Sequence, residues 1–273
     1  RRLSKGELVV SSPFSVTISF DSYVFVNVEL SMYDTLVDQL CEELSAYQIA
    51  CERDVASVLV SYLELVIEKN KVLNLTRITT PRDAVTLHLV DSLLPLSMTG
   101  IEMSNDSSLL DMGTGAGFPG VPLMVFTGSK ATLVDSVGKK VTAVNEFLQE
   151  LSLTRGEAVH ARLEELALRM PSTQTHVIAR AVAKTNVLIE YATPFLEKDG
   201  VLIVEKGRPD DQELREAEAA AKLCGLEYVS REMFELPREL GHREILLFRK
   251  TGRPRIKLPR RNGMAKSNPL GVS

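Results

Sequence analysis

Residues 111–120 read DMGTGAGFPG, and this stretch decides the fold of the chain. Apolar runs flank it on both sides, so the order predicts a strand, a glycine-rich turn and then a helix. The alternating glycines Gly113, Gly115 and Gly117 have no Cβ, which lets the backbone bend sharply and come close to a ligand. Pro119 suits the first turn of the following helix. The free N–H groups of that turn would attract a carboxylate or a phosphate.

The ligand of this turn has two main interpretations. An acidic residue just before G-x-G-x-G, here Asp111, is typical of S-adenosylmethionine sites in class I methyltransferases. Gly115, Gly117 and Gly120 also satisfy the G-x-G-x-x-G pattern of nicotinamide and flavin nucleotide sites. A turn without a ligand is the third interpretation. The turn alone favours S-adenosylmethionine and leaves the other two open.

The bulk composition describes an ordinary globular chain. It has 273 residues, of which 44% are hydrophobic and 25% charged, and both fractions are typical of globular domains. No apolar run reaches the roughly 20 residues that span a membrane. Three widely spaced cysteines form neither a zinc pattern nor a disulfide framework. We therefore expect a cytoplasmic protein with reduced thiols and no structural metal.

Charge is distributed unevenly along the chain. The formal net charge is −4, yet residues 249–266 hold eight basic residues and no acidic one, which leaves −12 for the rest. A basic tail on an acidic body indicates a polyanionic partner. The alternative is a disordered tail that only improves solubility.

The first third of the chain is expected to be helical from residue 33 onward. Residues 1–31 contain a β-prone stretch (15–28) and no signal-peptide core, so we expect an extension outside the main fold. Apolar residues then recur at helical spacing over 33–70, and a further helix begins at Pro81 with Thr80 as its cap. These segments predict an N-terminal helical cap over residues 32–105.

Strands and helices alternate over residues 106–250. Strands are expected at 108–111, 131–135, 157–160, 176–180, 200–205, 226–234 and 244–249, with helices at 121–126, 139–151, 163–169, 186–196 and 210–224. Such alternation implies a mostly parallel sheet with helices on both faces. The last two strands are joined by a short connection and should pair antiparallel. Residues 251–273 form the basic C-terminal tail.

Ligands of such sheets bind at the carboxyl ends of the strands. The second strand ends in Asp135, which lies 22 residues after Gly113 and matches the spacing of an acid that binds ribose hydroxyls. After the third strand, Leu163 could pack on a purine and Glu164 could meet its amino group; an ordinary helix start explains both residues equally well. A solvated loop acid is the alternative for Asp135.

The fourth and fifth strands end in basic residues. Arg180 could anchor a cofactor carboxylate or orient a base or phosphate, or it could form a structural ion pair. Lys206 could face a substrate or simply lie at the surface. No Asn/Asp-Pro-Pro-aromatic motif follows the fourth strand, which argues against an exocyclic amine as the methyl acceptor. His88 and Asp91 share a helix face but are too few for a metal site.

Taken together, these segments resemble the bacterial small-subunit ribosomal RNA guanine-N7 methyltransferases, the glucose-inhibited division protein B family. The matching segments occur in the right order from residue 32 to about residue 270. They are NKVLNLT (70–76), HLVDS (88–92), DMGTGAGFPGVPL (111–123), LVDSVGKK (133–140), ARLEEL (161–166), ARA (179–181), EKG (205–207) and PRRNGMAKSNPL (259–270). Ala116, Phe118 and Lys69 depart from residues frequent in the family.

The resemblance implies a fold, a cofactor and a reaction. The fold would be a Rossmann-like class I methyltransferase with an antiparallel last strand and an N-terminal helical cap. S-adenosylmethionine would be held by Gly113, Gly115, Gly117, Phe118, Asp135, Leu163, Glu164 and Arg180. The methyl group would go to N7 of a guanine in 16S ribosomal RNA by in-line displacement. N7 carries no proton, so no general base is required, and no catalytic residue is assigned. The basic tail would meet RNA phosphates, and we expect a monomer.

Overall fold

The computed structural model describes residues 8–9, 17–18 and 20–272, with side chains from residue 32 onward. A seven-stranded sheet forms its centre, with the strand order β5-β4-β3-β6-β7-β9-β8. Only β9 runs against its neighbours, pairing antiparallel with both β7 and β8. The predicted parallel sheet with an antiparallel last strand is therefore confirmed.

The strands follow the predicted order with small shifts at their ends. Their bounds are β3 Ser108–Met112, β4 Lys130–Asp135, β5 Gly156–His160, β6 Gln174–Arg180, β7 Leu196–Lys206, β8 Leu226–Leu236 and β9 Gly241–Lys250. The largest difference is at β7, which begins at Leu196, a position predicted to end a helix. Leu196 pairs with Gln174 of β6 across a register shift, so tertiary pairing extends this strand by four residues.

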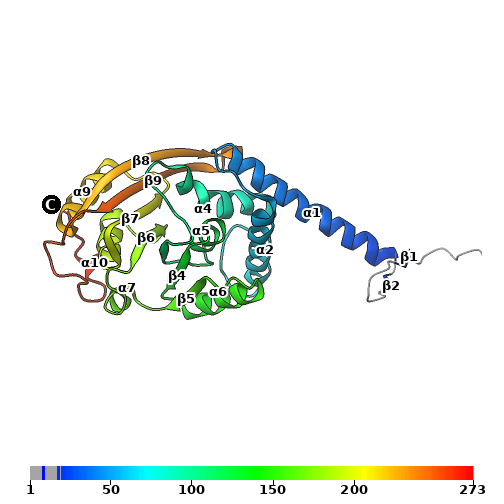
Figure 1. Ribbon diagram of the computed structural model, residues 1–273, viewed down its shortest axis with the longest axis horizontal. Coiled ribbons are helices and arrows are strands. Elements are labelled where there is room, and N and C mark those ends of the chain that lie inside the picture. Colours follow the sequence, from blue (N-terminus) through cyan, green and yellow to red (C-terminus); the bar gives the residue numbers. More distant parts are fainter. Residues whose placement is uncertain (1–7, 10–16, 19, 273) are drawn as a thin grey trace, which may run out of the picture.

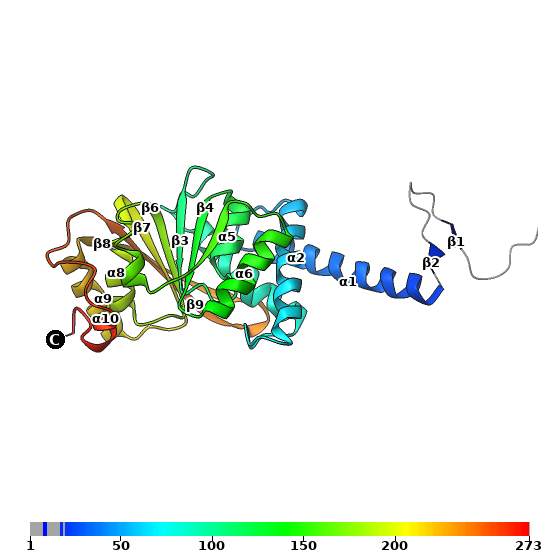
Figure 2. The same cartoon turned by 90° about the horizontal axis from the view of Figure 1, so that it is seen from below.

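Helices cover both faces of the sheet (Figure 2). Because successive side chains of a strand point to opposite faces, Leu109 of β3 packs in one core and Leu110 in the other. On the first face lie α2, α5 and α6, and on the second α7, α8, α9 and α10. Their bounds are α2 Arg53–Asn70, α5 Gly120–Thr127, α6 Gly138–Glu150, α7 Leu163–Leu166, α8 Thr185–Ala192, α9 Asp211–Cys224 and α10 Met264–Ser267.

The expected cap is helical, with differences at its start and at its last segment. Helix α1 (Phe20–Ser45) begins inside the stretch predicted to be β-prone and projects from the body of the molecule (Figure 1). Before it, the only described residues are a two-residue antiparallel pair, β1 (Leu8–Val9) with β2 (Thr17–Ile18). The rest of the predicted extension lies outside the described residues. The β-prone part of the sequence from residue 20 to residue 28 is therefore helical in the structure.

The segment after Pro81 is helical but not a single regular helix. It runs through α3 (Pro81–Ala84), a π-helix η1 (Val85–Val90), α4 (Asp91–Leu93) and a 3-10 helix η2 (Leu94–Ser97). Thr80 stands at the N-cap position, but its side chain makes no capping hydrogen bond; the predicted cap is wrong in that respect. Its backbone carbonyl accepts from Ala84 N–H at 2.9 Å instead.

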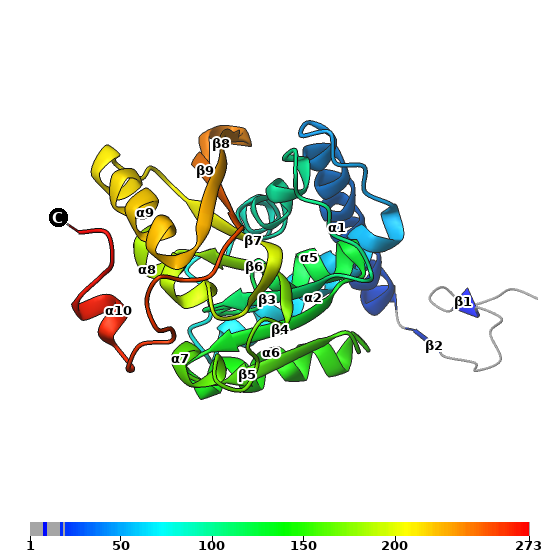
Figure 3. The ribbon, with the colours of Figure 1, turned by 60° about the vertical axis from the view of Figure 1, so that its left-hand side comes forward.

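The basic tail is folded against the sheet side that carries α8 (Figure 3). The Arg260 guanidinium pairs with the Glu190 carboxylate through two nitrogens, at 2.7 and 2.5 Å. Ala265 is 1% exposed and belongs to the second core, against which Leu258 and Leu270 also pack. The tail is therefore a structural part of the domain, and the disordered alternative is wrong.

Candidate functional site

The glycine turn between β3 and α5 is held by a buried carboxylate. Asp111 Oδ2 accepts hydrogen bonds from the Thr114 hydroxyl at 2.6 Å and from Gly120 N–H at 2.9 Å. Asp111 is fully buried, and burial raises its pKa to about 6. The acid of the motif therefore closes its own turn and does not face a ligand. A Cβ on Gly120 would lie 2.8 Å from this carboxylate, which explains the glycine at the start of α5.

The helical cap supports the same turn from the other side. The buried Tyr62 hydroxyl of α2 donates to Ala116 O at 2.9 Å. A Cβ on Gly117 would lie 2.0 Å from that hydroxyl. The Phe118 ring stacks on His88, with centroids 4.6 Å apart and an interplanar angle of 7°, and is 6% exposed. Gly117 and Phe118, both predicted to bind the cofactor, thus contact the cap in this structure.

Four of the predicted residues meet in one cavity at the carboxyl edge of the sheet. The cavity has a volume of about 240 Å³, and its walls include Gly113, Asp135, Leu163 and Glu164. These residues come from three different strand ends, as the sheet topology predicted. Its other walls are formed by Val134, Ser136, Ala161, Arg162, Ala181, Val182, Tyr191 and Lys266.

Asp135 joins the glycine turn to the loop after β4. Its Oδ2 accepts from Gly115 N–H at 3.0 Å, and its Oδ1 accepts from Val137 N–H at 2.8 Å. A carboxylate offers about four acceptor positions, so two remain for vicinal hydroxyls. Gly115 thus acts through its backbone and not as a wall of the cavity. The arrangement fits a ribose at this point.

Glu164 receives partners from two elements that are distant in sequence. Its Oε1 accepts from the Gly263 N–H of the tail at 2.9 Å. The Tyr191 phenol of α8 also donates to this carboxylate, and burial, together with the charge of Glu164, raises the pKa of Tyr191 to about 12. Glu164 is 9% exposed. The Gly263 N–H and the Tyr191 phenol therefore already orient the carboxylate that was predicted to meet the amino group of the purine.

Arg180 lies beside the cavity in a buried charge cluster. Its guanidinium is 3.2 Å from Asp91 and 3.8 Å from Glu205, while Arg243 Nε donates to Asp91 at 2.9 Å. Glu205 is 3% exposed, and neither of its oxygens accepts a hydrogen bond. Burial raises its pKa well above the ordinary value, against the opposing effect of Arg180. The geometry matches the structural ion pair among the interpretations of Arg180.

Two other candidate residues, Lys206 and His88, also contact groups of the same chain. Lys206 Nζ is 2.7 Å from Glu213 and donates to Ala183 O at 3.0 Å, so it does not face the cavity. The His88 ring lies 2.8 Å from the Thr76 hydroxyl. Within the described part of the chain, no cluster of His, Cys, Asp or Glu could hold a metal ion. None of the helices described there combines the length and hydrophobicity that a membrane span requires.

Sequence reasoning missed Tyr191, Val182 and Lys266 as walls of the cavity. Tyr191 sits in an apolar helix at a position with no special sequence signal. Lys266 belongs to a tail that was assigned to RNA alone. Val182 reaches the cavity because it follows β6 directly, whereas Tyr191 and Lys266 reach it because α8 packs on β7 and the tail helix α10 packs on α8.

A seven-stranded sheet of this order, with a glycine turn and an acidic residue at its carboxyl edge, defines the class I methyltransferase fold. Solved structures share it: the [4+2]-cyclase SpnF matches with a TM-score of 0.51 at 13% identity, covering 71% of this chain and 94% of that one. A sarcosine dimethylglycine methyltransferase described as putative, from Galdieria sulphuraria, matches with a TM-score of 0.50 at 13% identity, covering 63% and 87%.

Sequence comparison is more specific. The family model of rRNA small subunit methyltransferase G matches residues 55–241. The enzyme of that name from Desulfitobacterium hafniense is 37% identical over 77% of this chain and 87% of its own length. The one from Gloeobacter violaceus is 39% identical over 76% and 83%. The chain belongs to the rRNA small subunit methyltransferase G family.

This membership confirms the fold, the family and the enzyme class expected from the sequence. The protein is an S-adenosylmethionine-dependent rRNA methyltransferase. The choice between S-adenosylmethionine and a nicotinamide or flavin nucleotide is thereby decided for the former.

Proposed function

We propose that this protein methylates N7 of one guanine in 16S ribosomal RNA, in the cytoplasm, as a monomer. Gly113, Asp135, Leu163 and Glu164 support the cofactor site because they converge on one cavity at the sheet edge where such ligands bind. That convergence is the observation that carries the proposal. The family model supports the small-subunit RNA as the substrate.

Different residues of the cavity would bind different parts of the cofactor. Asp135 has acceptor positions left for the ribose hydroxyls, Leu163 forms an apolar wall for the purine, and Glu164 is oriented to accept from its amino group. Gly113 has a φ of +77°, and a Cβ there would lie 2.7 Å from Val182. When bound, S-adenosylmethionine supplies an electrophilic methyl group on a sulfonium.

The reaction requires positioning more than proton transfer. Guanine N7 has an in-plane lone pair and no proton, so the protein need not hold a base. Holding two reactants in line can contribute roughly 7–11 kcal/mol. We propose that the rigid turn, fixed by Asp111 and Tyr62, provides this alignment.

The test has two stages on the full chain. Calorimetric titration with S-adenosylhomocysteine should show one-to-one binding that Asp135→Ala weakens about tenfold or more, equivalent to ~1.4 kcal/mol or more. Asp106→Ala is the matched control, because Asp106 is exposed and lies before β3, at the opposite edge. Equal affinities in all three proteins would contradict the placement of the ribose.

The second stage identifies the product. Small-subunit RNA and intact small subunits from cells lacking the enzyme are incubated with S-adenosylmethionine, and the nucleosides are then analysed by mass spectrometry. We expect N7-methylguanosine at one position. Methylation at another atom, or none with either substrate, would overturn the proposal.

A further inference from the structure

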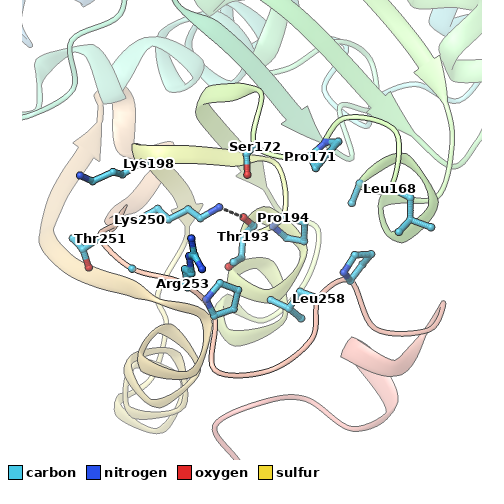
Figure 4. Close-up of a pocket in the computed structure, with 14 residues that line it drawn as sticks. Leu168, Pro171, Ser172, Thr193, Pro194, Lys198, Lys250, Thr251, Arg253 and Leu258 are labelled. Carbon is cyan, nitrogen blue, oxygen red and sulfur yellow. Dashed lines mark hydrogen bonds between the residues drawn. The ribbon is translucent and has the colours of Figure 1, made fainter.

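A larger cavity opens at the edge of the sheet opposite the cofactor site (Figure 4). Its volume is about 690 Å³, and it lies between the loop before β6, the start of β7, the end of β9 and the beginning of the tail. Neither the predicted site residues nor the family assignment accounts for it. Its walls include Pro171, Pro194 and Leu258, which offer apolar surface, and three basic residues.

The charge of this cavity is uniformly positive. Lys198, Lys250 and Arg253 line it, and no acidic residue does. Among the ion pairs of the described residues, none includes any of these three cations. Figure 4 shows that Lys250 and Arg253 both come from the end of β9 and the start of the tail, whereas the exposed Lys198 comes from the start of β7. Although the protein has a net negative charge, this cavity therefore contains three basic side chains that no carboxylate of the described residues neutralises.

Lys250 is fixed where an anion could reach it. Its Nζ donates to the carbonyls of Thr193 and Leu196, at 3.0 and 2.5 Å. An ammonium group has three donors, so one remains for a ligand. Burial lowers its pKa from the ordinary value, and a bound anion would oppose that effect by favouring the charged form.

The walls are held in place by backbone hydrogen bonds. Ser172 N–H donates to Pro194 O at 2.8 Å, which joins the loop before β6 to the segment before β7. Thr251 and Gly252 both donate to Gly225 O, at 3.1 and 3.0 Å. The cavity is therefore formed before any ligand arrives, which lowers the entropic cost of binding.

The tail connects this cavity to the cofactor site. It starts at the cavity wall with Gly252 and reaches Glu164 through the Gly263 N–H. The seven residues of β6 separate the two edges by about 23 Å at ~3.3 Å per residue. Exposed basic residues mark the route between them, namely Arg255, Lys257 and Arg261.

We propose that this cavity binds a nucleotide of the ribosomal RNA substrate remote from the methylated guanine. Lys250 and Arg253 would contact its phosphate, and the prolines and Leu258 would pack against its base or ribose. RNA is preferred over a free nucleotide because the tail continues the positive charge towards the cofactor site. The inference rests on the proposed function and adds a second anchoring point for the same substrate.

The test compares RNA affinity as a function of salt. The variants are Arg253→Gln and Lys198→Gln, with Lys130→Gln as the matched control, since Lys130 is exposed at the same edge on β4. Each loss of a phosphate contact should reduce the slope of log affinity against log salt by about 0.7–0.9. We expect this for Arg253→Gln on long small-subunit RNA fragments, a smaller decrease for Lys198→Gln at the rim, and no change for Lys130→Gln.

RNA length provides an internal control. A short hairpin that carries only the mapped target guanine cannot span both edges, so Arg253→Gln should bind it as the wild type does. An unchanged slope for Arg253→Gln on the long fragment would overturn the inference, as would an equal loss for Lys130→Gln. Tight, Arg253-dependent binding of adenosine monophosphate alone would also overturn it in favour of a free nucleotide.

Failure of this inference is distinguishable from failure of the proposed function. If the wild type methylates guanine N7 and Arg253→Gln shows no RNA defect, only the second site is wrong. If the wild type produces no N7-methylguanosine, the proposed function is wrong. Binding of S-adenosylhomocysteine by every variant checks that each one is folded.

Discussion

Glu164 accepts a hydrogen bond at 2.9 Å from the backbone N–H of Gly263, 99 residues further along the chain. The bond ties the basic tail to the wall of the proposed cofactor cavity. Lys266, three residues after Gly263, lines the same cavity. A tail assigned from its charge to RNA alone is therefore also part of the proposed cofactor site. In the proposed function, the residues that would contact RNA and those that would contact the cofactor therefore belong to one folded segment.

Replacing Glu164 with alanine should weaken cofactor binding. The change leaves the Gly263 N–H without its acceptor and removes the partner of the Tyr191 hydroxyl. An unsatisfied buried group costs about 1–3 kcal/mol, so we expect the affinity for S-adenosylhomocysteine to fall about 5- to 150-fold in calorimetry. Glu165→Ala is the control, because Glu165 is exposed and contacts only the Asn262 side chain at 2.5 Å in this region. Similar losses in both variants would contradict the role assigned to Glu164.

Gly113 and Gly115 should differ in what an added methyl group does. Both have positive φ, +77° and +61°, so alanine at either position costs roughly 1–2 kcal/mol of stability. Only at Gly113 would the Cβ meet a side chain, Val182 at 2.7 Å, and both of these residues line the cavity. We expect Gly113→Ala to reduce the affinity for S-adenosylhomocysteine at least tenfold, and Gly115→Ala to reduce mainly the free energy of unfolding.

A second substitution checks that explanation. In Gly113→Ala/Val182→Ala the contact disappears, so part of the lost affinity should return. No recovery in the double variant would show that backbone strain, and not the contact with Val182, governs binding.

Arg180 should act mainly on stability, through Glu205. Arg180→Met leaves the buried Glu205 without its nearest counter-charge, whereas Asp91 keeps Arg243 at 2.9 Å. Removing one partner of a buried pair costs about 3–5 kcal/mol, measurable by urea unfolding. Arg180→Met/Glu205→Gln should recover most of that loss, because the buried charge is gone as well. Additive losses in the double variant would be inconsistent with the ion pair.

The same double variant addresses the predicted cofactor role of Arg180. If Arg180 only balances Glu205, the double variant binds S-adenosylhomocysteine like the wild type. If it anchors the cofactor, the affinity stays low although stability returns.

Asp111 should make stability fall as pH rises from about 4 to about 6. Its pKa is raised from 3.8 to about 6 in the folded protein by burial. Within that window the folded state holds a proton that the unfolded state has released, so the free energy of unfolding decreases with pH. Asp111→Asn removes the titration and keeps an oxygen acceptor for Thr114 and Gly120.

The measurement is urea unfolding across pH 4–7 in a Glu205→Gln background, because the charge of Asp111 also raises the pKa of Glu205. Two proteins are compared in that background, one with Asp111 and one with Asp111→Asn. The free energy of unfolding of the first, relative to the second, should drop by on the order of 2–3 kcal/mol across the window. A constant difference between the two proteins would contradict the raised pKa.

Local sequence patterns were sufficient to predict the strands and helices, and also the site residues that follow directly after strands. Alternating apolar periods placed β3 to β9 and the helices between them to within a few residues, except where Leu196 pairs with β6. The spacing from Gly113 to Asp135 brought both residues to one cavity, because parallel strands joined by helices end at one edge. The periodicity of apolar residues and the spacing between motifs involve residues that are close along the chain, so both can be recognised in a single sequence.

Only the tertiary structure decided which groups meet across long separations. It placed Asp111 inside the turn, Phe118 against His88 and Arg180 against Asp91, where sequence alone allowed a ligand for Phe118 and Arg180. It also folded the tail onto α8 and brought Gly263 to Glu164. These contacts join residues between 9 and 99 positions apart. These contacts depend on packing and on the need to pair buried polar groups. Neither can be predicted from a local sequence pattern.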